Sequence, residues 1–216
     1  MPVSNIHGLF DKQIYLDIAE RLRSVGFFFR EFVYSPASVG SICSSSRSLA
    51  KALIHMAPPK KGIVIDLGAG SGVISAELIR AGVPPERIMA VEVSKVFCKE
   101  FSARCPNVPL IVGNACSLEA IIASHHKNAD VCAIISSLPL RVLRTAMVKE
   151  IMREVHTVLT KRGGIFIQYT YAWWLNYPLR QYGLVPKATQ IVSRNIPPAK
   201  IESYTILNQS VTQPHE

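Results

Sequence analysis

An aspartate and three glycines follow an apolar run near residue 65, and together they could hold a nucleotide-type ligand. Residues 63–67 read Ile-Val-Ile-Asp-Leu, residues 68–72 read Gly-Ala-Gly-Ser-Gly, and a helix-like segment continues over residues 73–81. Glycines let the backbone approach a ligand that a Cβ atom would exclude. A strand, a glycine-rich turn and a helix in this order are typical of nucleotide-cofactor sites.

Two residues of this motif decide which cofactor it suits. The dinucleotide fingerprint requires glycine at position 73, where this chain has Val73. Asp66 stands two residues before the first glycine, where its charge would repel a pyrophosphate but would suit the ammonium of an amino-acid moiety. Both features favour S-adenosylmethionine, whose methionine end carries that ammonium, over a nicotinamide dinucleotide.

Further positions complete the predicted cofactor site. Glu92 lies twenty residues past Gly72, at the end of the second expected strand, where a carboxylate can accept hydrogen bonds from both ribose hydroxyls. Asn114 follows the third expected strand, where methyltransferases usually carry Asp to accept a hydrogen bond from the adenine amino group. Its amide oxygen can still accept, as a neutral and weaker partner. The predicted cofactor set is Asp66, Gly68, Ala69, Gly70, Gly72, Glu92, Val93, Asn114, Ala115 and Ser136.

The elements expected to position these residues alternate between strand and helix. Apolar runs bounded by turn residues predict five strands, with helix-like segments between them. Strands joined by helices of this length imply a parallel, doubly wound sheet whose ligands lie beyond the carboxyl ends of the strands. The expected strands are residues 63–67, 87–92, 108–112, 131–135 and 165–169, and the expected helices are residues 73–81, 94–103, 117–125 and 144–159.

The two ends of the chain depart from this alternation. Residues 189–194 and 200–207 are strand-like, and the five residues between them are too few for a helical crossover, so we expect an antiparallel pair. Such a hairpin is the usual ending of a class I methyltransferase sheet. We therefore predict an α/β, Rossmann-like doubly wound sheet over residues 61–216, mostly parallel with a C-terminal antiparallel hairpin. Residues 1–60 are an N-terminal extension whose helices, expected at residues 12–24 and 45–56, cover the cleft.

The loop after the fourth expected strand, residues 136–140, faces the transferring methyl group in this fold. RNA and DNA amino-methyltransferases carry Asn-Pro-Pro-Tyr or Asn-Leu-Pro-Tyr here, where Asn binds the amino group and the aromatic ring stacks on the base. This chain reads Ser-Ser-Leu-Pro-Leu, with no Asn at position 136 and no aromatic residue at position 140. The base-stacking platform is therefore missing at its expected position.

The chain resembles the soluble bacterial phospholipid N-methyltransferases at positions along most of its length. The most specific matches are Ser136-Ser137-Leu138-Pro139-Leu140 and Gln168-Tyr169-Thr170-Tyr171, and Arg30-Glu31-Phe32 and Asn195-Ile196-Pro197-Pro198-Ala199 also match. Ser44, Ala69 and Asn114 stand where that family tends to have Pro, Pro and Asp. The resemblance implies methylation of phosphatidylethanolamine toward phosphatidylcholine, with S-adenosylmethionine as the methyl donor.

Methyl transfer to nitrogen requires an uncharged amine held near the methyl carbon. Ser136 and Ser137 are the predicted cradle for that amine, assisted by Glu31 or Tyr169, and aromatic rings can hold a methylated ammonium by cation–π attraction. Structural alternatives stay open: Glu31 pairing with an arginine, Tyr169 as a core residue, and the two arginines that follow the loop as a solvated helix start. The predicted substrate-binding residues are Tyr34, Leu138, Arg141, Arg144 and Tyr171, with both arginines on the lipid phosphate.

Composition and charge narrow the class of partner. The net charge is +9, and residues 140–200 carry ten Lys or Arg and two acidic residues. A basic flank suits a polyanion, either RNA or an anionic membrane surface, with a basic surface that has no partner as the alternative. No run is apolar over the roughly 18 residues that span a bilayer, and the N-terminus has no export signal. We predict a cytoplasmic protein that is peripheral at the inner face of the membrane and acts on a phospholipid, with RNA a less favoured partner.

Alternatives for the first helix, for metal binding and for function stay open. Residues 12–24 combine an apolar stripe with basic neighbours and predict either a membrane-binding helix or a cover for the cleft. Five cysteines without a C-x-x-C pair, and histidines without ligand spacing, predict reduced thiols and no metal. One rival function is an rRNA adenine dimethyltransferase, opposed by the 136–140 loop and by the absence of a C-terminal helical domain. The other is a non-catalytic membrane- or RNA-binding protein on the same scaffold, for which Asn114 is the supporting feature.

Overall fold

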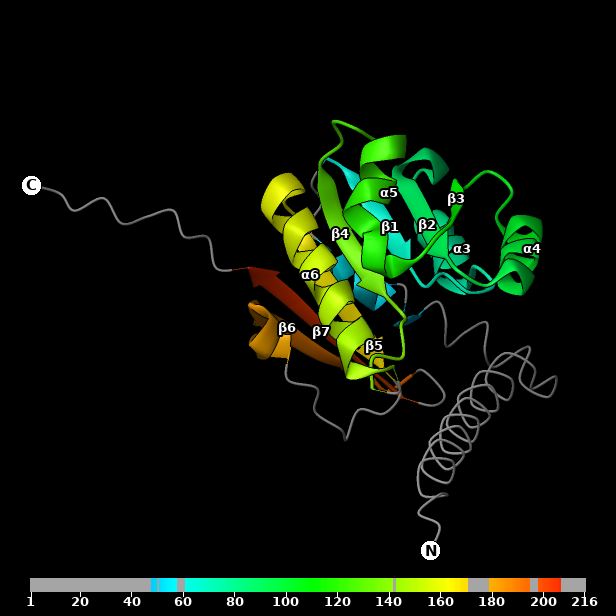
Figure 1. Cartoon of the computed structure of the whole chain (residues 1–216). Helices are drawn as coiled ribbons and strands as arrows, with labels where there is room; N and C mark the ends of the chain where they lie inside the picture. Colours follow the sequence, from blue (N-terminus) through cyan, green and yellow to red (C-terminus); the bar gives the residue numbers. More distant parts are fainter. Residues whose placement is uncertain are drawn as a thin grey trace, which may run out of the picture. The chain divides into compact units, whose positions relative to one another are not determined.

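Seven strands of the described residues form one sheet, and helices pack on both of its faces (Figure 1). The computed structural model describes residues 48–49, 51–57, 61–141, 143–170, 179–194 and 198–206. The strand order is β3-β2-β1-β4-β5-β7-β6, and β7 runs antiparallel to both of its neighbours while the other pairings are parallel. The strands are β1 (Ile63–Leu67), β2 (Ile88–Glu92), β3 (Leu110–Val112), β4 (Val131–Ser136), β5 (Ile165–Thr170), β6 (Leu184–Val192) and β7 (Ala199–Ile206).

Two apolar cores lie on opposite faces of this sheet because successive strand residues point to opposite sides. In β1, Val64 belongs to one core and Ile63, Ile65 and Leu67 to the other. The first core includes α3 (Val73–Arg80), α4 (Lys95–Arg104) and the helical residues 51–56, through side chains such as Leu53. The second core includes α5 (Leu118–His125) and α6 (Thr145–Arg162), which lie side by side in Figure 1.

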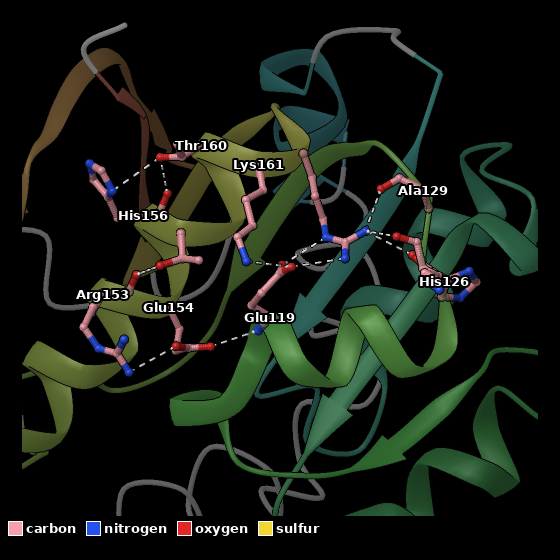
Figure 2. A network of polar contacts seen from close by, with 11 residues as sticks. Glu119, His126, Ala129, Arg153, Glu154, His156, Thr160 and Lys161 are labelled. Atoms are coloured by element: carbon pink, nitrogen blue, oxygen red, sulfur yellow. Dashed lines mark hydrogen bonds and ion pairs between the residues drawn. The ribbon is translucent and has the colours of Figure 1, made fainter. Parts of the chain in front are cut away.

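Polar contacts join α5 to α6 at the edge of the sheet where β4 begins (Figure 2). Arg162, at the end of α6, donates to both carboxylate oxygens of Glu119 at 3.0 and 3.2 Å. It also donates to the carbonyl oxygens of His126, Lys127 and Ala129 at 3.1 to 3.2 Å, which lie in the connection from α5 to β4. Burial alone would raise the pKa of Glu119, but Arg162 and Lys161 lower that pKa below its ordinary value. One arginine therefore fixes this connection and with it the start of β4.

The predicted fold class is confirmed, and the corrections fall on element ends. β3 begins at Leu110 rather than at residue 108, next to Pro109, which lacks the backbone N–H that a strand pairing uses. β6 begins at Leu184, five residues before the predicted start, and most of it is exposed at the edge of the sheet. An edge strand with polar, exposed side chains carries no apolar run, so the pattern used for the other strands missed its first half.

The N-terminal predictions lie mostly outside the described residues. The helix expected over residues 12–24 falls there entirely. The helix expected over residues 45–56 is present where it is described, at residues 48–49 and 51–56, with Leu49 and Leu53 buried in the core. No helix of the described part is long and apolar enough to cross a membrane.

Candidate functional site

The glycine turn joins β1 to α3, and its three glycines have different roles. Gly68, Gly70 and Gly72 have φ of +76°, +54° and +81°, which L side chains rarely adopt. A Cβ atom on Gly68 would lie 2.6 Å from Leu138 Cδ2, and one on Gly72 would lie 2.8 Å from Phe101 Cδ2. A Cβ atom on Gly70 would meet nothing closer than 4.0 Å. Close packing therefore requires the outer glycines, while the middle one faces open space that a ligand can use.

The turn is fixed from two neighbouring elements. Gly68 N and Ala69 N both donate to the carbonyl oxygen of Val91 on β2, at 2.9 and 3.2 Å. From α4, the guanidinium of Arg104 donates to Ser71 O at 2.7 Å and to Ser71 Oγ at 2.8 Å. Sequence reasoning did not include Arg104, because thirty-three residues separate it from Ser71 and no local pattern connects them. The turn is preorganised by these bonds rather than shaped by a ligand.

Glu92 ends β2 and is buried, and backbone amides bind both of its carboxylate oxygens. Oε2 accepts from Gly70 N at 2.9 Å, and Oε1 accepts from Val93 N at 2.9 Å and Ser94 N at 2.8 Å. A carboxylate offers about four lone-pair sites, so three of them are taken and one remains on Oε2. The sequence-based prediction gave Glu92 both ribose hydroxyls, and this geometry leaves room for one unless an amide is displaced.

Asp66 is fully buried beneath the turn. Its Oδ2 accepts a hydrogen bond from Ser75 Oγ on α3 at 2.6 Å. Burial raises the pKa of Asp66 to about 6, because desolvation disfavours the charged form more than the hydrogen bonds from Ser75 favour it. A cation placed beside this buried carboxylate would stabilise its ionised form. The predicted contact with the ammonium of an amino-acid moiety would provide such a cation.

Two exposed valines flank the carboxyl ends of β2 and β3. Val93 is 67% exposed and Val112 is 57% exposed, although both are neighbours of the buried Glu92, which Val93 follows in the chain and Val112 pairs with across the sheet. Exposed apolar side chains at this edge of an open α/β sheet suit the flat face of a ligand ring. Val93 was predicted as a cofactor residue, whereas Val112 was missed because a strand valine carries no signal of exposure in the sequence.

Asn114 already uses its amide oxygen within the protein. Asn114 Oδ1 accepts from Cys116 N at 2.9 Å and so caps the short helix η3 (Ala115–Ser117). An amide oxygen has two lone pairs, and one therefore remains for the predicted contact with adenine. Ala115 opens the same helix and is half-buried.

The loop after β4 packs directly on the glycine turn. Ser137 N donates to Leu67 O at 3.2 Å, and Ser137 Oγ donates to Gly68 O. Ser136 is fully buried, and its Oγ accepts from Leu138 N at 3.3 Å. The two predicted catalytic serines are thus brought beside the cofactor turn, and their hydroxyls hold the loop in place.

Gln168 on β5 supports this loop from the neighbouring strand. Its Nε2 donates to Leu138 O at 3.1 Å and to Tyr169 O at 3.0 Å, while its Oε1 is buried without a hydrogen-bond partner among the described residues. In the sequence, Gln168 belongs to a string that resembles the phospholipid N-methyltransferases, and its neighbours give no further sign of a role. A buried acceptor without a donor is visible only once the fold places it.

The other predicted site residues divide into three groups. Tyr169 is partly buried and packs against the first core, the one that includes α3. This agrees with the alternative interpretation of Tyr169 as a core residue. Arg141 is exposed, and Arg144 is an exposed residue at the start of α6 that makes no side-chain cap. Glu31, Tyr34 and Tyr171 lie outside the described residues.

Within the described ranges, no group of three His, Cys, Asp or Glu side chains could hold a metal ion.

Comparisons with known proteins agree with this geometry. A family model described as a methyltransferase domain matches residues 64–163. No curated protein is similar enough in sequence to match. The fold is similar to that of a glycopeptide N-methyltransferase, MtfA, at 15% identity and a TM-score of 0.58, covering 76% of this chain and 91% of that chain.

Two further solved structures share the fold. One is the 1,6-didemethyltoxoflavin-N1-methyltransferase of Burkholderia thailandensis, at 16% identity and a TM-score of 0.57, covering 95% of this chain and 92% of that chain. The other is a TehB-like S-adenosylmethionine-dependent methyltransferase from Corynebacterium glutamicum, at 12% identity and a TM-score of 0.56, covering 87% of this chain and 98% of that chain. Identities at this level show a shared fold, which is the predicted class I methyltransferase fold.

Proposed function

We propose that this chain, which carries a methyltransferase domain over residues 64–163, is an S-adenosylmethionine-dependent N-methyltransferase acting on the amine of a phospholipid head group. The observation that carries the cofactor is the turn between β1 and α3. Its middle glycine, Gly70, faces open space while its amide is held by Glu92, which keeps one acceptor site free. Bound S-adenosylmethionine supplies an electrophilic methyl group on a sulfonium.

The residues present fit this cofactor along its length. Asp66 is a buried carboxylate that a nearby ammonium would stabilise, and Glu92 can accept from a ribose hydroxyl. Val93 and Val112 offer apolar surface for the adenine ring, with Asn114 beside them as a hydrogen-bond acceptor. These groups lie at or just after the carboxyl ends of the neighbouring strands β1, β2 and β3, where open α/β sheets bind their ligands.

The acceptor is proposed from the loop after β4 and from the resemblance to phospholipid N-methyltransferases. Ser137 and Leu138 pack this loop on Gly68, so a group held by the loop lies beside the cofactor turn. The loop has no aromatic platform for a nucleobase. Two structural neighbours are named as N-methyltransferases of other acceptors, which supports nitrogen as the methylated atom and leaves the phospholipid as our proposal.

The protein's own part in the transfer is alignment and protection of the neutral amine. Fixed loops bring the acceptor nitrogen into line with the methyl carbon, and this positioning does much of the catalytic work in a displacement reaction. A partly buried site favours the uncharged amine, because desolvation lowers the pKa of an ammonium. Arg141 and Arg144 are exposed cations just after the loop and are proposed to bind the lipid phosphate.

A competition assay tests this function. The protein is incubated with methyl-labelled S-adenosylmethionine and either phosphatidylethanolamine vesicles or deproteinised ribosomal RNA, and label is counted in each fraction. We expect label in the lipid. Label in RNA alone would establish the rival adenine methyltransferase, and cofactor binding without label in either fraction would support the non-catalytic scaffold.

The cellular setting is part of the same proposal. A phospholipid acceptor requires contact with a bilayer, and we propose a cytoplasmic protein that is peripheral at the inner face of the membrane. The ten basic residues of the 140–200 region suit the anionic lipids of such a surface.

A further inference from the structure

The buried acceptor on Gln168 has a fixed direction. Its Nε2 donates to two carbonyl oxygens, Leu138 O at 3.1 Å and Tyr169 O at 3.0 Å. Carbonyl oxygens only accept hydrogen bonds, so the NH₂ group and not the carbonyl of the Gln168 amide must face them. Oε1 is thereby held away from both carbonyls, and the amide cannot be flipped to give it a donor.

Gln168 Oε1 is the sole buried side-chain oxygen or nitrogen without a partner in the described part of the chain. The great majority of buried polar atoms in proteins have a partner, so an exception requires an explanation such as a functional ligand. The residue as a whole is half-buried, whereas its Oε1 atom is shielded from solvent, so a ligand N–H that bonds to Oε1 at the carboxyl end of β5 must displace the group that covers it.

The sheet register places Gln168 beside the loop that carries the proposed amine cradle. Gln168 is the partner of Ser136 on β4, and the two residues therefore point to the same face of the sheet. On its other side it is the partner of Glu202 on β7, whose carboxylate is paired with Lys200 at 2.9 Å. In this row, Gln168 Oε1 is the buried acceptor that receives no hydrogen bond among the described residues.

We propose that Gln168 Oε1 accepts a hydrogen bond from the N–H of the acceptor amine and so orients the nitrogen lone pair toward the methyl carbon. This inference rests on the proposed function, since it needs an amine acceptor in front of the loop. In the transfer, the nitrogen lone pair forms the new N–C bond while the C–S bond breaks and leaves its electron pair on sulfur. The methylated nitrogen then releases its N–H proton to water, and Gln168 stays neutral throughout.

The chemistry of successive methylation provides a specific test. The neutral primary amine of phosphatidylethanolamine has two N–H bonds and the monomethyl amine has one, but the dimethyl amine has none. An N–H acceptor can therefore assist the first two transfers and cannot assist the third. A residue that only supports the loop would assist all three equally.

The experiment compares the Gln168→Met variant with the wild type on vesicles of phosphatidylethanolamine, its N-monomethyl form and its N,N-dimethyl form. We expect kcat/KM to fall about tenfold more on the first two lipids than on the third, because the loss of the loop contacts slows all three transfers equally and the loss of the N–H acceptor slows only the first two. The ratio between lipids is independent of the folded fraction. Gln190→Met is the matched control, because Gln190 lies exposed on the edge strand β6, and it should change none of the three rates.

Binding of S-adenosylmethionine, measured by calorimetry, should be the same in the variant and the wild type. Equal slowing on all three lipids, or no slowing on the first two, would overturn the role of Gln168. A wild type that binds the cofactor but methylates none of the lipids would overturn the proposed function, and the inference with it. If the wild type accepts only phosphatidylethanolamine, we expect kcat to fall in the variant at unchanged cofactor affinity, because a bound but misaligned amine reacts slowly, and an unchanged kcat would overturn the role of Gln168.

Discussion

The carboxylate of Asp66 is only 1% exposed, and it accepts its side-chain hydrogen bond from Ser75 rather than from a cation. These two properties rarely occur together. Its pKa, raised to about 6 by burial, means that near pH 6 about half of the molecules carry a proton there. An ammonium placed beside it would lower that pKa, because an opposite charge favours the ionised form. Binding of the cofactor ammonium beside Asp66 should therefore release a proton from this carboxyl group near pH 6.

We predict that binding of S-adenosylmethionine at pH 6 releases up to about half a proton from Asp66. Calorimetry in buffers of different ionisation enthalpy measures this release. Near pH 8 the carboxylate is already ionised in the free protein, so its contribution should vanish. The Asp66→Asn variant has no proton to lose and should show no such release at pH 6. Wild-type binding without proton release at pH 6 would show that the cofactor ammonium does not bind beside Asp66.

Gly70 tests the geometry of the same turn. An added Cβ atom on Gly70 would meet only open space, so Gly70→Val should place a side chain where the cofactor approaches and weaken cofactor binding by at least about tenfold. A side chain in the left-handed region also costs roughly 1–2 kcal/mol of folding stability. Gly82→Val is the matched control, since Gly82 has φ +95° and no heavy atom within 4 Å of an added Cβ atom.

Both glycine variants should lose similar amounts of stability in a denaturant titration, whereas only the Gly70 variant should lose affinity in calorimetry. Unchanged cofactor affinity in Gly70→Val would show that the cofactor does not bind at this turn.

The connection between α5 and β4 depends on Arg162 more than on any surface pair nearby. Its side chain is 9% exposed and binds Glu119 and three carbonyl oxygens. Arg162→Met keeps the apolar stem but leaves these acceptors without a donor, and we expect a loss of about 3 kcal/mol in the free energy of unfolding. Lys161→Met is the control: the Lys161 side chain is 60% exposed and its Nζ lies 3.6 Å from Glu119 Oε1, so the expected loss is below about 1 kcal/mol.

The pH dependence of unfolding gives a second readout for this pair. Because Arg162 and Lys161 outweigh burial and lower the pKa of Glu119, the ionised pair stabilises the fold above the ordinary pKa of 4.5, and this stabilisation is lost as the pH falls through the lowered value. Urea titrations between neutral and acidic pH should show a shallower loss in Arg162→Met. Equal curves for Arg162→Met and the wild type would show that the pair does not stabilise the fold.

The sequence predicted the buried elements well and the exposed ones poorly. β1 is found at its predicted bounds, residues 63–67, because a strand covered on both faces is a continuous apolar run. The start of β6 was missed because it is a polar edge strand. Local motifs identified Asp66, the glycines and Glu92, whereas Arg104, Ser75 and the free oxygen of Gln168 depend on contacts between distant segments, which no local pattern contains.

For the molecule as a whole, the proposed contact with a membrane surface is based on the basic 140–200 region and on the predicted helix over residues 12–24. We predict that deletion of residues 1–25 weakens flotation with vesicles rich in anionic lipid, and that added salt weakens flotation of the full chain, because the attraction is screened. Flotation that is undiminished by the deletion would assign that segment a role other than membrane binding.

The proposed reaction adds methyl groups to the nitrogen of an ethanolamine phospholipid. Mass spectrometry of the lipids extracted after incubation with S-adenosylmethionine and phosphatidylethanolamine vesicles tests it most directly. We predict head groups heavier by one or more methyl groups, and at S-adenosylmethionine concentrations below saturation they should form at least about tenfold more slowly with the Gly70→Val variant. An unmodified lipid pool, with a wild-type protein that binds S-adenosylmethionine in the same buffer, would contradict the claim.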